Sequence, residues 1–226
     1  MKLSLDTANL DEIREAIGWG VLRGVTTNPS LIAKEAQDFL PLVKEICSLV
    51  DGDVSIETSS LDPDVLMRQG HDIAQIADNA VVKVAMSPGG LGATRKLAAE
   101  GIKVNITLVF SPAQAILAAE AGAYIVSPFL GRLDDIAVDG LQLLSQICEI
   151  YAVQGYDTQV LAASLRHPIH VVEAARMGAD IGTMPFSVFK VLVKHPLTDA
   201  GYEKFLGDWE GAKAQLGELP PSMQEE

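Results

Sequence analysis

The chain has 226 residues, of which 48% are hydrophobic, and its formal net charge is −13. A chain this acidic lacks the basic face that binds nucleic acid or an anionic membrane, so we expect neither partner. No apolar run approaches the ~20 residues of a membrane span, and Asp6 comes too early for a signal peptide. Two cysteines cannot define a disulfide framework, and we therefore expect a cytoplasmic protein.

Short apolar runs alternate with helical patterns along the chain. A strand is expected at residues 3–6, a helix follows from Asp11 to Trp19, and residues 24–30 are expected to form a strand that runs into a turn. Further strands are expected at residues 53–57, 81–86, 102–107, 124–127, 159–164 and 180–183, with helices between them that include residues 91–100 and 141–151. Several of these helices end in a glycine just before the next strand, which is a common way for a helix to stop.

Eight strand–helix cycles without a β-hairpin signal predict an α/β fold, a (β/α)₈ TIM barrel of parallel strands. The alternative is a doubly wound sheet, but residues 5–8 are not the glycine-rich turn that such a sheet carries after its first strand. We predict one domain over residues 1–219, with an extra C-terminal helix at about 197–216 and a disordered tail at 220–226. That helix carries several large apolar residues, which need cover from its own barrel or from a neighbouring subunit.

A lysine stands in the middle of the apolar strand at residues 81–86. Burial of Lys83 would favour its neutral amine, which can attack a carbonyl and form a Schiff base. An edge strand with Lys83 in solvent is the alternative. Active sites of barrels lie at the C-terminal ends of the strands. The polar residues at those predicted ends are Asp6, Thr26, Asn28, Glu57, Lys83, Thr107, residues 127–132, Ser164 and Arg166.

These residue types suit a Schiff-base aldol reaction. Lys83 would attack a ketone, while Asp6 and Glu57 would balance its charge and move protons during dehydration and C–C cleavage. The imine itself stores the electrons, so no metal or organic cofactor is required. Arg132 and Arg166 follow strand ends and could clamp a substrate phosphate, with Ser164 as a further donor.

Each of these residues also has a purely structural interpretation. Asp6 and Glu57 could cap the helices that follow them, and Thr26 and Asn28 could belong to turn chemistry. Arg132 could pair with an acid on its own helix, Asp134 or Asp135, and Ser164 could simply end a strand.

Three other features carry no expected function. His167 and His170 lack the spacing of metal ligands, and we expect them to be solvated. Residues 87–90 are expected to form a turn and lack the Gly-Lys-Ser/Thr ending of a phosphate-binding loop. Cys47 and Cys148 are expected to pack on helix faces.

Several segments resemble the transaldolase family, and the chain length is similar to that of its short-chain branch, which also contains the fructose-6-phosphate aldolases. These segments are residues 24–30 (GVTTNPS), 82–84 (VKV), 105–111 (NITLVFS), 127–132 (SPFLGR) and 163–166 (ASLR). The resemblance implies a class I aldolase-type barrel. It also implies transfer of a dihydroxyacetone unit from sedoheptulose 7-phosphate or fructose 6-phosphate to glyceraldehyde 3-phosphate or erythrose 4-phosphate, in the pentose phosphate pathway.

The resemblance also implies a role for each matched residue. Lys83 is similar to the Schiff-base lysine, Asp6 to the acid–base group of C–C cleavage, and Glu57 with Thr107 to the pair that positions a water. The residues that resemble hydroxyl-binding groups are Asn28, Asn105 and Ser127, those that resemble the phosphate site are Arg132, Ser164 and Arg166, and Thr26 and Phe129 complete the expected substrate-binding set. The C-terminal helix is similar to one that packs on a neighbouring subunit in a homo-oligomer, a pentameric ring or a decamer.

Two alternatives to a transaldolase remain. A fructose-6-phosphate aldolase would release free dihydroxyacetone, but the aldolases of this branch carry Gln where Glu57 stands and Tyr where Phe129 stands. A non-catalytic sugar-phosphate-binding barrel is the second alternative. It would be expected if Lys83, Asp6 or Glu57 were replaced, and all three are present.

Overall fold

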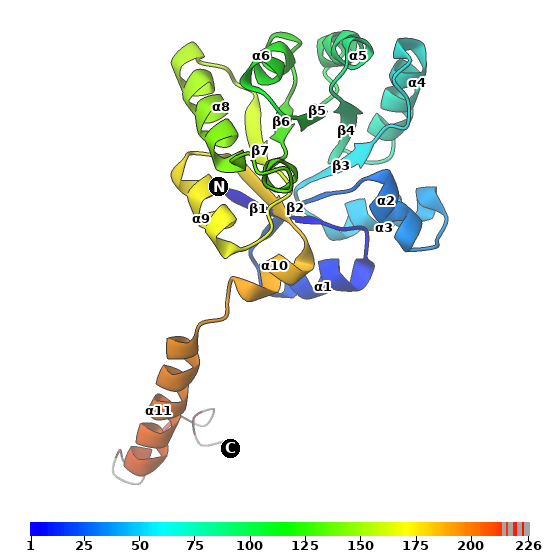
Figure 1. The fold of residues 1–226 in the computed structure, drawn as a ribbon. Coiled ribbons are helices and arrows are strands. Elements are labelled where there is room, and N and C mark those ends of the chain that lie inside the picture. The colour runs from blue at the N-terminus through cyan, green and yellow to red at the C-terminus, as the bar shows by residue number, and fades with distance from the viewer. Residues whose placement is uncertain (214–215, 217–218, 221–222, 224–226) are drawn as a thin grey trace. The chain divides into compact units, whose positions relative to one another are not determined.

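Eight parallel strands close into a barrel in the order β1 to β8, and helices surround it (Figure 1). The computed structural model describes residues 1–213, 216, 219, 220 and 223. The strands are β1 (Lys2–Asp6), β2 (Leu22–Thr26), β3 (Asp53–Glu57), β4 (Ala80–Ala85), β5 (Val104–Val109), β6 (Ile125–Pro128), β7 (Gln159–Ala162) and β8 (Ile181–Met184). The predicted TIM barrel is therefore confirmed, and the doubly wound sheet is wrong because β1 pairs with β8.

The helices follow the strands with short connections. They are α1 (Leu10–Gly18), α2 (Pro29–Lys34), α3 (Phe39–Leu49), α4 (Pro63–Ala74), α5 (Pro88–Ala99), α6 (Pro112–Glu120), α7 (Leu130–Asp134), α8 (Gly140–Gln154), α9 (Pro168–Arg176), α10 (Phe186–Val191) and α11 (Pro196–Lys213). Residues 87–90, expected to form a turn, instead begin α5, because Ser87 caps the helix by accepting from the Gly90 amide at 2.9 Å and Pro88 suits its first position.

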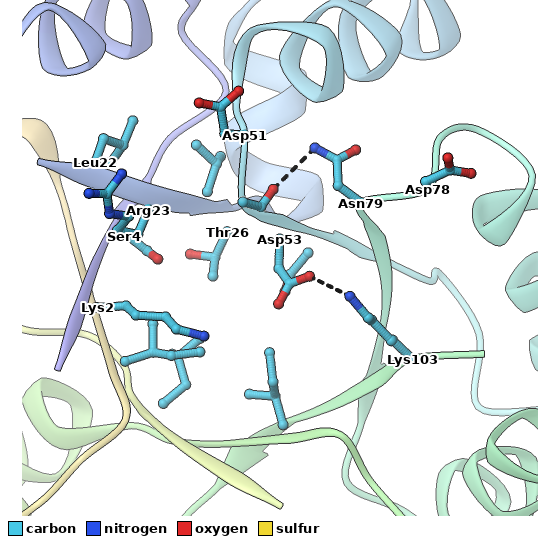
Figure 2. Close-up of a pocket in the computed structure, with 16 residues that line it drawn as sticks. Lys2, Ser4, Leu22, Arg23, Thr26, Asp51, Asp53, Asp78, Asn79 and Lys103 are labelled. Atoms are coloured by element: carbon cyan, nitrogen blue, oxygen red, sulfur yellow. Dashed lines mark hydrogen bonds and ion pairs between the residues drawn. The ribbon is translucent and has the colours of Figure 1, made fainter. Parts of the chain in front are cut away.

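The barrel interior is filled unevenly. On one side an apolar cluster fills it, formed by Val81, Ile125, Leu161, Ala163 and Ile181. Beside β1 and β3 a cavity of about 450 Å³ remains at the N-terminal ends of the strands, and the small side chains of Ser4 and Ser55 are among the residues that line it. Figure 2 shows Lys2, Asp53 and Lys103 around this cavity, with Lys103 bonded to Asp53 at 2.9 Å. Catalysis in this fold occurs at the opposite ends of the strands.

The chain divides into two units, Met1–Phe189, which contains the barrel, and Lys190–Glu226. The second unit contains α11, which confirms the predicted C-terminal helix over residues 196–213. Most of the predicted tail at 220–226 lies outside the described residues, and a single domain over 1–219 stays a prediction. None of the helices in the described part of the chain has the length and apolar character needed to cross a membrane.

Candidate active site

Lys83 is buried inside the barrel. Its side chain lies on β4, and the parallel register sets it opposite Glu57 of β3 and Asn105 of β5. The residue is 4% exposed, its Nζ lies 2.9 Å from Glu57 Oε2, and Nζ donates to the Thr27 carbonyl at 2.8 Å. The alternative of a solvent-facing lysine on an edge strand is wrong, because a closed barrel has no edge.

Asp6 ends β1 at the same end of the barrel. Thr26 Oγ1 donates to Asp6 Oδ1 at 2.9 Å, and Thr26 Oγ1 also lies 2.8 Å from Thr183 Oγ1. Burial raises the pKa of Asp6 above its ordinary value, and this outweighs the lowering effect of the nearby Lys83 ammonium. A carboxyl group with a raised pKa suits a group that takes up a proton and returns it.

The helix-capping interpretation of the two acids is wrong. Asn9 caps α1, and Asp62 caps α4, so neither Asp6 nor Glu57 is needed there. Thr183, at the end of β8, is a site residue that the sequence reasoning missed. The strand predicted at 180–183 ended on it, and the rule that selected the other polar strand ends would have selected Thr183 too.

Strands β5 and β6 add a buried chain of polar side chains. Ser127 Oγ donates to Asn105 Oδ1 at 2.7 Å, and Asn105 Nδ2 donates to Ser55 Oγ at 3.0 Å. Thr107 Oγ1 is buried and has no hydrogen-bond partner among the described residues. A buried hydroxyl without a partner is costly, which marks Thr107 as a group that awaits a ligand or a water.

A small cavity joins many of these groups. It has a volume of about 10 Å³, close to what a single water needs. Its lining consists of Asp6, Thr26, Lys83, Thr107, Ser127, Phe129, Leu161, Ala163, Ser164 and Thr183. Seven of the predicted site residues therefore meet in one place.

Arg132, Ser164 and Arg166 lie at the neighbouring part of the barrel mouth. The Arg132 guanidinium lies 5.1 Å from the centroid of the Phe129 ring. Arg166 Nη2 contacts Asp135 at 2.9 Å, and Arg166 Nε donates to Ser164 Oγ at 3.3 Å. Both arginines are exposed, so their charges are open to a ligand.

The backbone of this region is unusual. Ser164 has a φ of 59°, in the left-handed region that a side chain disfavours, and its carbonyl accepts from the Gly131 amide at 3.1 Å. Arg132 does not form the ion pair with Asp134 or Asp135 that was its structural alternative. Asp135 pairs with Arg166, and Asp134 pairs with His170.

Two predicted positions differ from expectation. Asn28 caps α2, with Oδ1 accepting from the Leu31 amide at 3.0 Å, which agrees with its structural interpretation. It lines a second cavity of about 460 Å³ beside Glu57 and does not line the Lys83 cavity. The expectation that His170 is solvated is wrong, because contacts with Asp134 and the α9 start leave it 5% exposed.

Comparison with known proteins covers almost the whole chain. The family model described as "Transaldolase/Fructose-6-phosphate aldolase" matches residues 3–219. A "Probable transaldolase" of Hydrogenobaculum sp. (strain Y04AAS1) is 55% identical over 210 residues, 93% of this chain and 97% of that protein. A "Probable transaldolase" of Aquifex aeolicus is 56% identical with the same coverage. A "Probable transaldolase 1" of Listeria monocytogenes serotype 4b is 55% identical over 94% of this chain and 100% of its own length.

Proposed function

Since the chain belongs to the transaldolase/fructose-6-phosphate aldolase family, we propose that it is a transaldolase that carries a dihydroxyacetone unit on Lys83. The donor is sedoheptulose 7-phosphate or fructose 6-phosphate, and the acceptor is an aldose phosphate, in the pentose phosphate pathway. The observation that carries this proposal is the buried contact of Lys83 Nζ with Glu57 Oε2 at 2.9 Å. Through this contact the Glu57 carboxylate can accept a proton from the Lys83 side chain.

The first half of the reaction builds the imine. Glu57 accepts a proton from the Lys83 ammonium, and the free amine attacks the ketone carbonyl to give a carbinolamine. Glu57 then returns a proton to the carbinolamine hydroxyl, and water leaves as the protonated imine forms. The unpartnered hydroxyl of Thr107 is available to hold that water.

The second half breaks and remakes the carbon–carbon bond. Asp6 takes the proton from the hydroxyl β to the imine carbon, the C–C bond breaks, and the electron pair moves into the protonated imine to form an enamine. The aldehyde product leaves, and an aldose phosphate takes its place. The enamine then attacks the new aldehyde, Asp6 returns its proton, and hydrolysis releases the new ketose.

The remaining site residues bind substrate in this proposal. Asn105 and Ser127 bind the dihydroxyacetone hydroxyls, whereas Asn28 caps α2 outside the Lys83 cavity and its substrate-binding role rests on the family resemblance alone. Ser164, Arg132 and Arg166 bind the phosphate, for which two exposed guanidinium groups offer charge-assisted contacts. We also propose that the protein acts in the cytoplasm as a homo-oligomer held by α11.

Borohydride trapping tests the proposal. Reduction in the presence of fructose 6-phosphate should leave a stable adduct, which peptide mapping should locate on Lys83. With erythrose 4-phosphate as acceptor, the enzyme should form sedoheptulose 7-phosphate and little free dihydroxyacetone. Abundant free dihydroxyacetone would identify the aldolase instead, and the absence of any adduct would favour a non-catalytic sugar-phosphate-binding barrel.

Lys83→Met should abolish trapping and turnover while the barrel remains folded, because Met retains the length and the apolar stem. The matched control is Lys103→Met, which removes a lysine paired with Asp53 at the opposite end of the barrel. The control should retain turnover, and substantial turnover by Lys83→Met would remove Lys83 from its role.

A further inference from the structure

A buried histidine joins the two segments that carry the arginines. His170 lies in the first turn of α9 and is 5% exposed. Its Nδ1 accepts from the backbone amide of Arg166 at 3.3 Å, and its Nε2 lies 3.1 Å from Asp134 Oδ2 at the end of α7. The arginines themselves stand on these same two segments, Arg132 on α7 and Arg166 after β7.

The partners of His170 determine its tautomer. A backbone amide can only donate, so Nδ1 must be unprotonated, and the Asp134 carboxylate accepts, so the proton lies on Nε2. A neutral imidazole meets both demands. A doubly protonated imidazole would turn Nδ1 into a donor that faces the Arg166 amide, and that hydrogen bond would be lost.

The loop that His170 holds needs support. Ser164 has a φ of 59°, a strained conformation for a residue with a side chain, and such a conformation persists only where its surroundings hold it. Three contacts tie this loop to α7 and its C-cap: the Leu130 amide donates to the Ala163 carbonyl at 3.0 Å, the Gly131 amide donates to the Ser164 carbonyl at 3.1 Å, and Asp135 contacts Arg166 Nη2 at 2.9 Å. A phosphate bound to Arg166 would compete with Asp135 for the guanidinium group. The hydrogen bond between His170 and the Arg166 backbone amide would remain.

We propose that His170, as the neutral Nε2–H tautomer, is a positioning residue that holds the Arg166 backbone in the geometry for binding the substrate phosphate. This inference rests on the phosphate site of the proposed function and adds a residue to it. The consequence is that phosphate affinity depends on the protonation of His170 and falls when the imidazole becomes charged.

The surroundings favour the neutral form at neutral pH. Burial lowers the pKa of His170, and the neighbouring His167 and Arg166 act in the same direction. The carboxylates of Asp134 and Asp139 act in the opposite direction and do not overcome the effect of burial. The His167 ring lies 3.8 Å from the His170 ring between centroids, so two positive charges there would repel.

Two substitutions separate the contacts of the imidazole. His170→Asn retains an acceptor at the position of Nδ1 and cannot gain a proton. His170→Gln retains a donor toward Asp134 and loses the acceptor for the Arg166 amide. The matched control is His71→Asn, which breaks another histidine–carboxylate contact, to Glu100 at 2.7 Å, between α4 and the end of α5.

Binding of inorganic phosphate, measured by calorimetry at pH 7.5, tests the proposal directly. His170→Gln should weaken binding at least tenfold, whereas His170→Asn and His71→Asn should stay within about threefold of wild type. Equal affinity of wild type and His170→Gln would overturn the proposal, and so would a wild-type protein that binds no phosphate. Far-UV circular dichroism checks that each variant is folded.

The pH dependence provides a second readout. Wild-type affinity should fall as the pH drops below the ordinary histidine value of about 6.5, more steeply than in His170→Asn, because phosphate titration is common to both proteins. Identical profiles would overturn the proposal even if His170→Gln failed to fold.

Borohydride trapping by unphosphorylated dihydroxyacetone should be equal in wild type, His170→Asn and His170→Gln. Loss of trapping in wild type would contradict the proposed function and leave the phosphate result standing.

Discussion

Thr183 and Thr26 give Asp6 a directed hydrogen bond. An ionised Asp6 can only accept, so Thr26 donates its single proton to it, and Thr183 must then donate to Thr26. One oxygen of Asp6 is therefore bound to Thr26. In the proposed mechanism the other oxygen takes the proton of the substrate hydroxyl, and Thr26 and Thr183 fix its position.

Replacing Asp6 should raise the stability of the folded protein and lower its activity. An acid whose pKa is raised on folding holds its proton more tightly in the folded state, so the free energy of unfolding falls as the pH rises through that range. Asp6→Asn removes this penalty and should raise the thermal midpoint at pH 7. The gain should shrink as the pH falls toward and below about 4, the ordinary Asp pKa, because the carboxyl group then becomes protonated in the unfolded state as well.

The same variant should lose about 10²- to 10⁴-fold in turnover, the usual contribution of a general acid–base group. It should still form the borohydride-trapped adduct on Lys83. Thermal unfolding at several pH values and a coupled turnover assay measure the two effects. Normal C–C cleavage by Asp6→Asn would exclude Asp6 as the acid–base group.

Replacing Thr107 should also raise stability and lower activity, here because an unsatisfied hydroxyl is removed and not a buried charge. Its buried hydroxyl has no partner among the described residues, so Thr107→Val removes an unsatisfied polar group while keeping the side-chain shape. We expect stabilisation by about 1–3 kcal/mol in denaturant unfolding, with slower formation and hydrolysis of the imine. A destabilised variant with full activity would show that the hydroxyl has a structural partner and no role in catalysis.

Two elements, α7 and the loop after β7, are packed so closely that one glycine is required between them. A Cβ on Gly131 would lie 2.4 Å from the Ser164 carbonyl oxygen and 2.6 Å from Arg166 Nε. The first of these atoms belongs to the backbone and cannot move alone. The contact between the two elements therefore sets the spacing of Arg132, Ser164 and Arg166, the residues proposed to bind the phosphate.

Gly131→Ala should separate α7 from this loop. We expect a loss of about 1–3 kcal/mol in stability, typical of overpacking, and a KM for fructose 6-phosphate raised at least tenfold. Trapping by unphosphorylated dihydroxyacetone should be unaffected. The matched control is Gly92→Ala on α5, where a Cβ meets nothing within 4 Å, and there we expect a gain of about 0.5–1 kcal/mol. Equal KM values for the two variants would contradict this account.

The barrel carries a cluster of polar side chains at one end and a cavity at the other. Closure of the sheet brings together the ends of eight strands that lie far apart in the sequence.

The helix α11 of the second unit exposes large apolar side chains. Taken by itself, α11 buries none of its residues, and Tyr202 and Phe205 are 63% and 69% exposed. Large apolar groups at helical spacing favour an association surface.

Charged residues on that apolar face should disrupt an oligomer. Tyr202→Glu combined with Phe205→Glu should lower the mass in solution to that of the monomer, 24.1 kDa, as measured by light scattering coupled to size exclusion. The control is Lys204→Glu, which changes the opposite face of the same helix, where Lys204 contacts Asp208. A monomeric wild type, or a double variant of unchanged mass, would exclude α11 as the assembly contact.

Local pattern was sufficient to predict much of the fold and part of the site. Strand and helix periodicities depend on neighbouring residues, so the eight cycles, and with them the barrel, could be predicted from the chain alone. The rule that polar residues at strand ends face one rim then brought Asp6, Lys83 and Thr107 into one site. Exact starts of helices were less predictable, and α5 begins at Pro88 because a serine cap overrides the turn preference of residues 87–90.

The order of the elements and the residue types at the strand ends could be read from the chain, whereas a buried and a solvent-facing Lys83 both remained open. Which of those side chains meet depends on how the barrel closes. Thr26 and Thr183 are 157 positions apart and touch because the barrel closes. The buried His170 of α9 likewise meets Asp134 of α7. Such contacts join distant segments, and no periodicity within one segment encodes them.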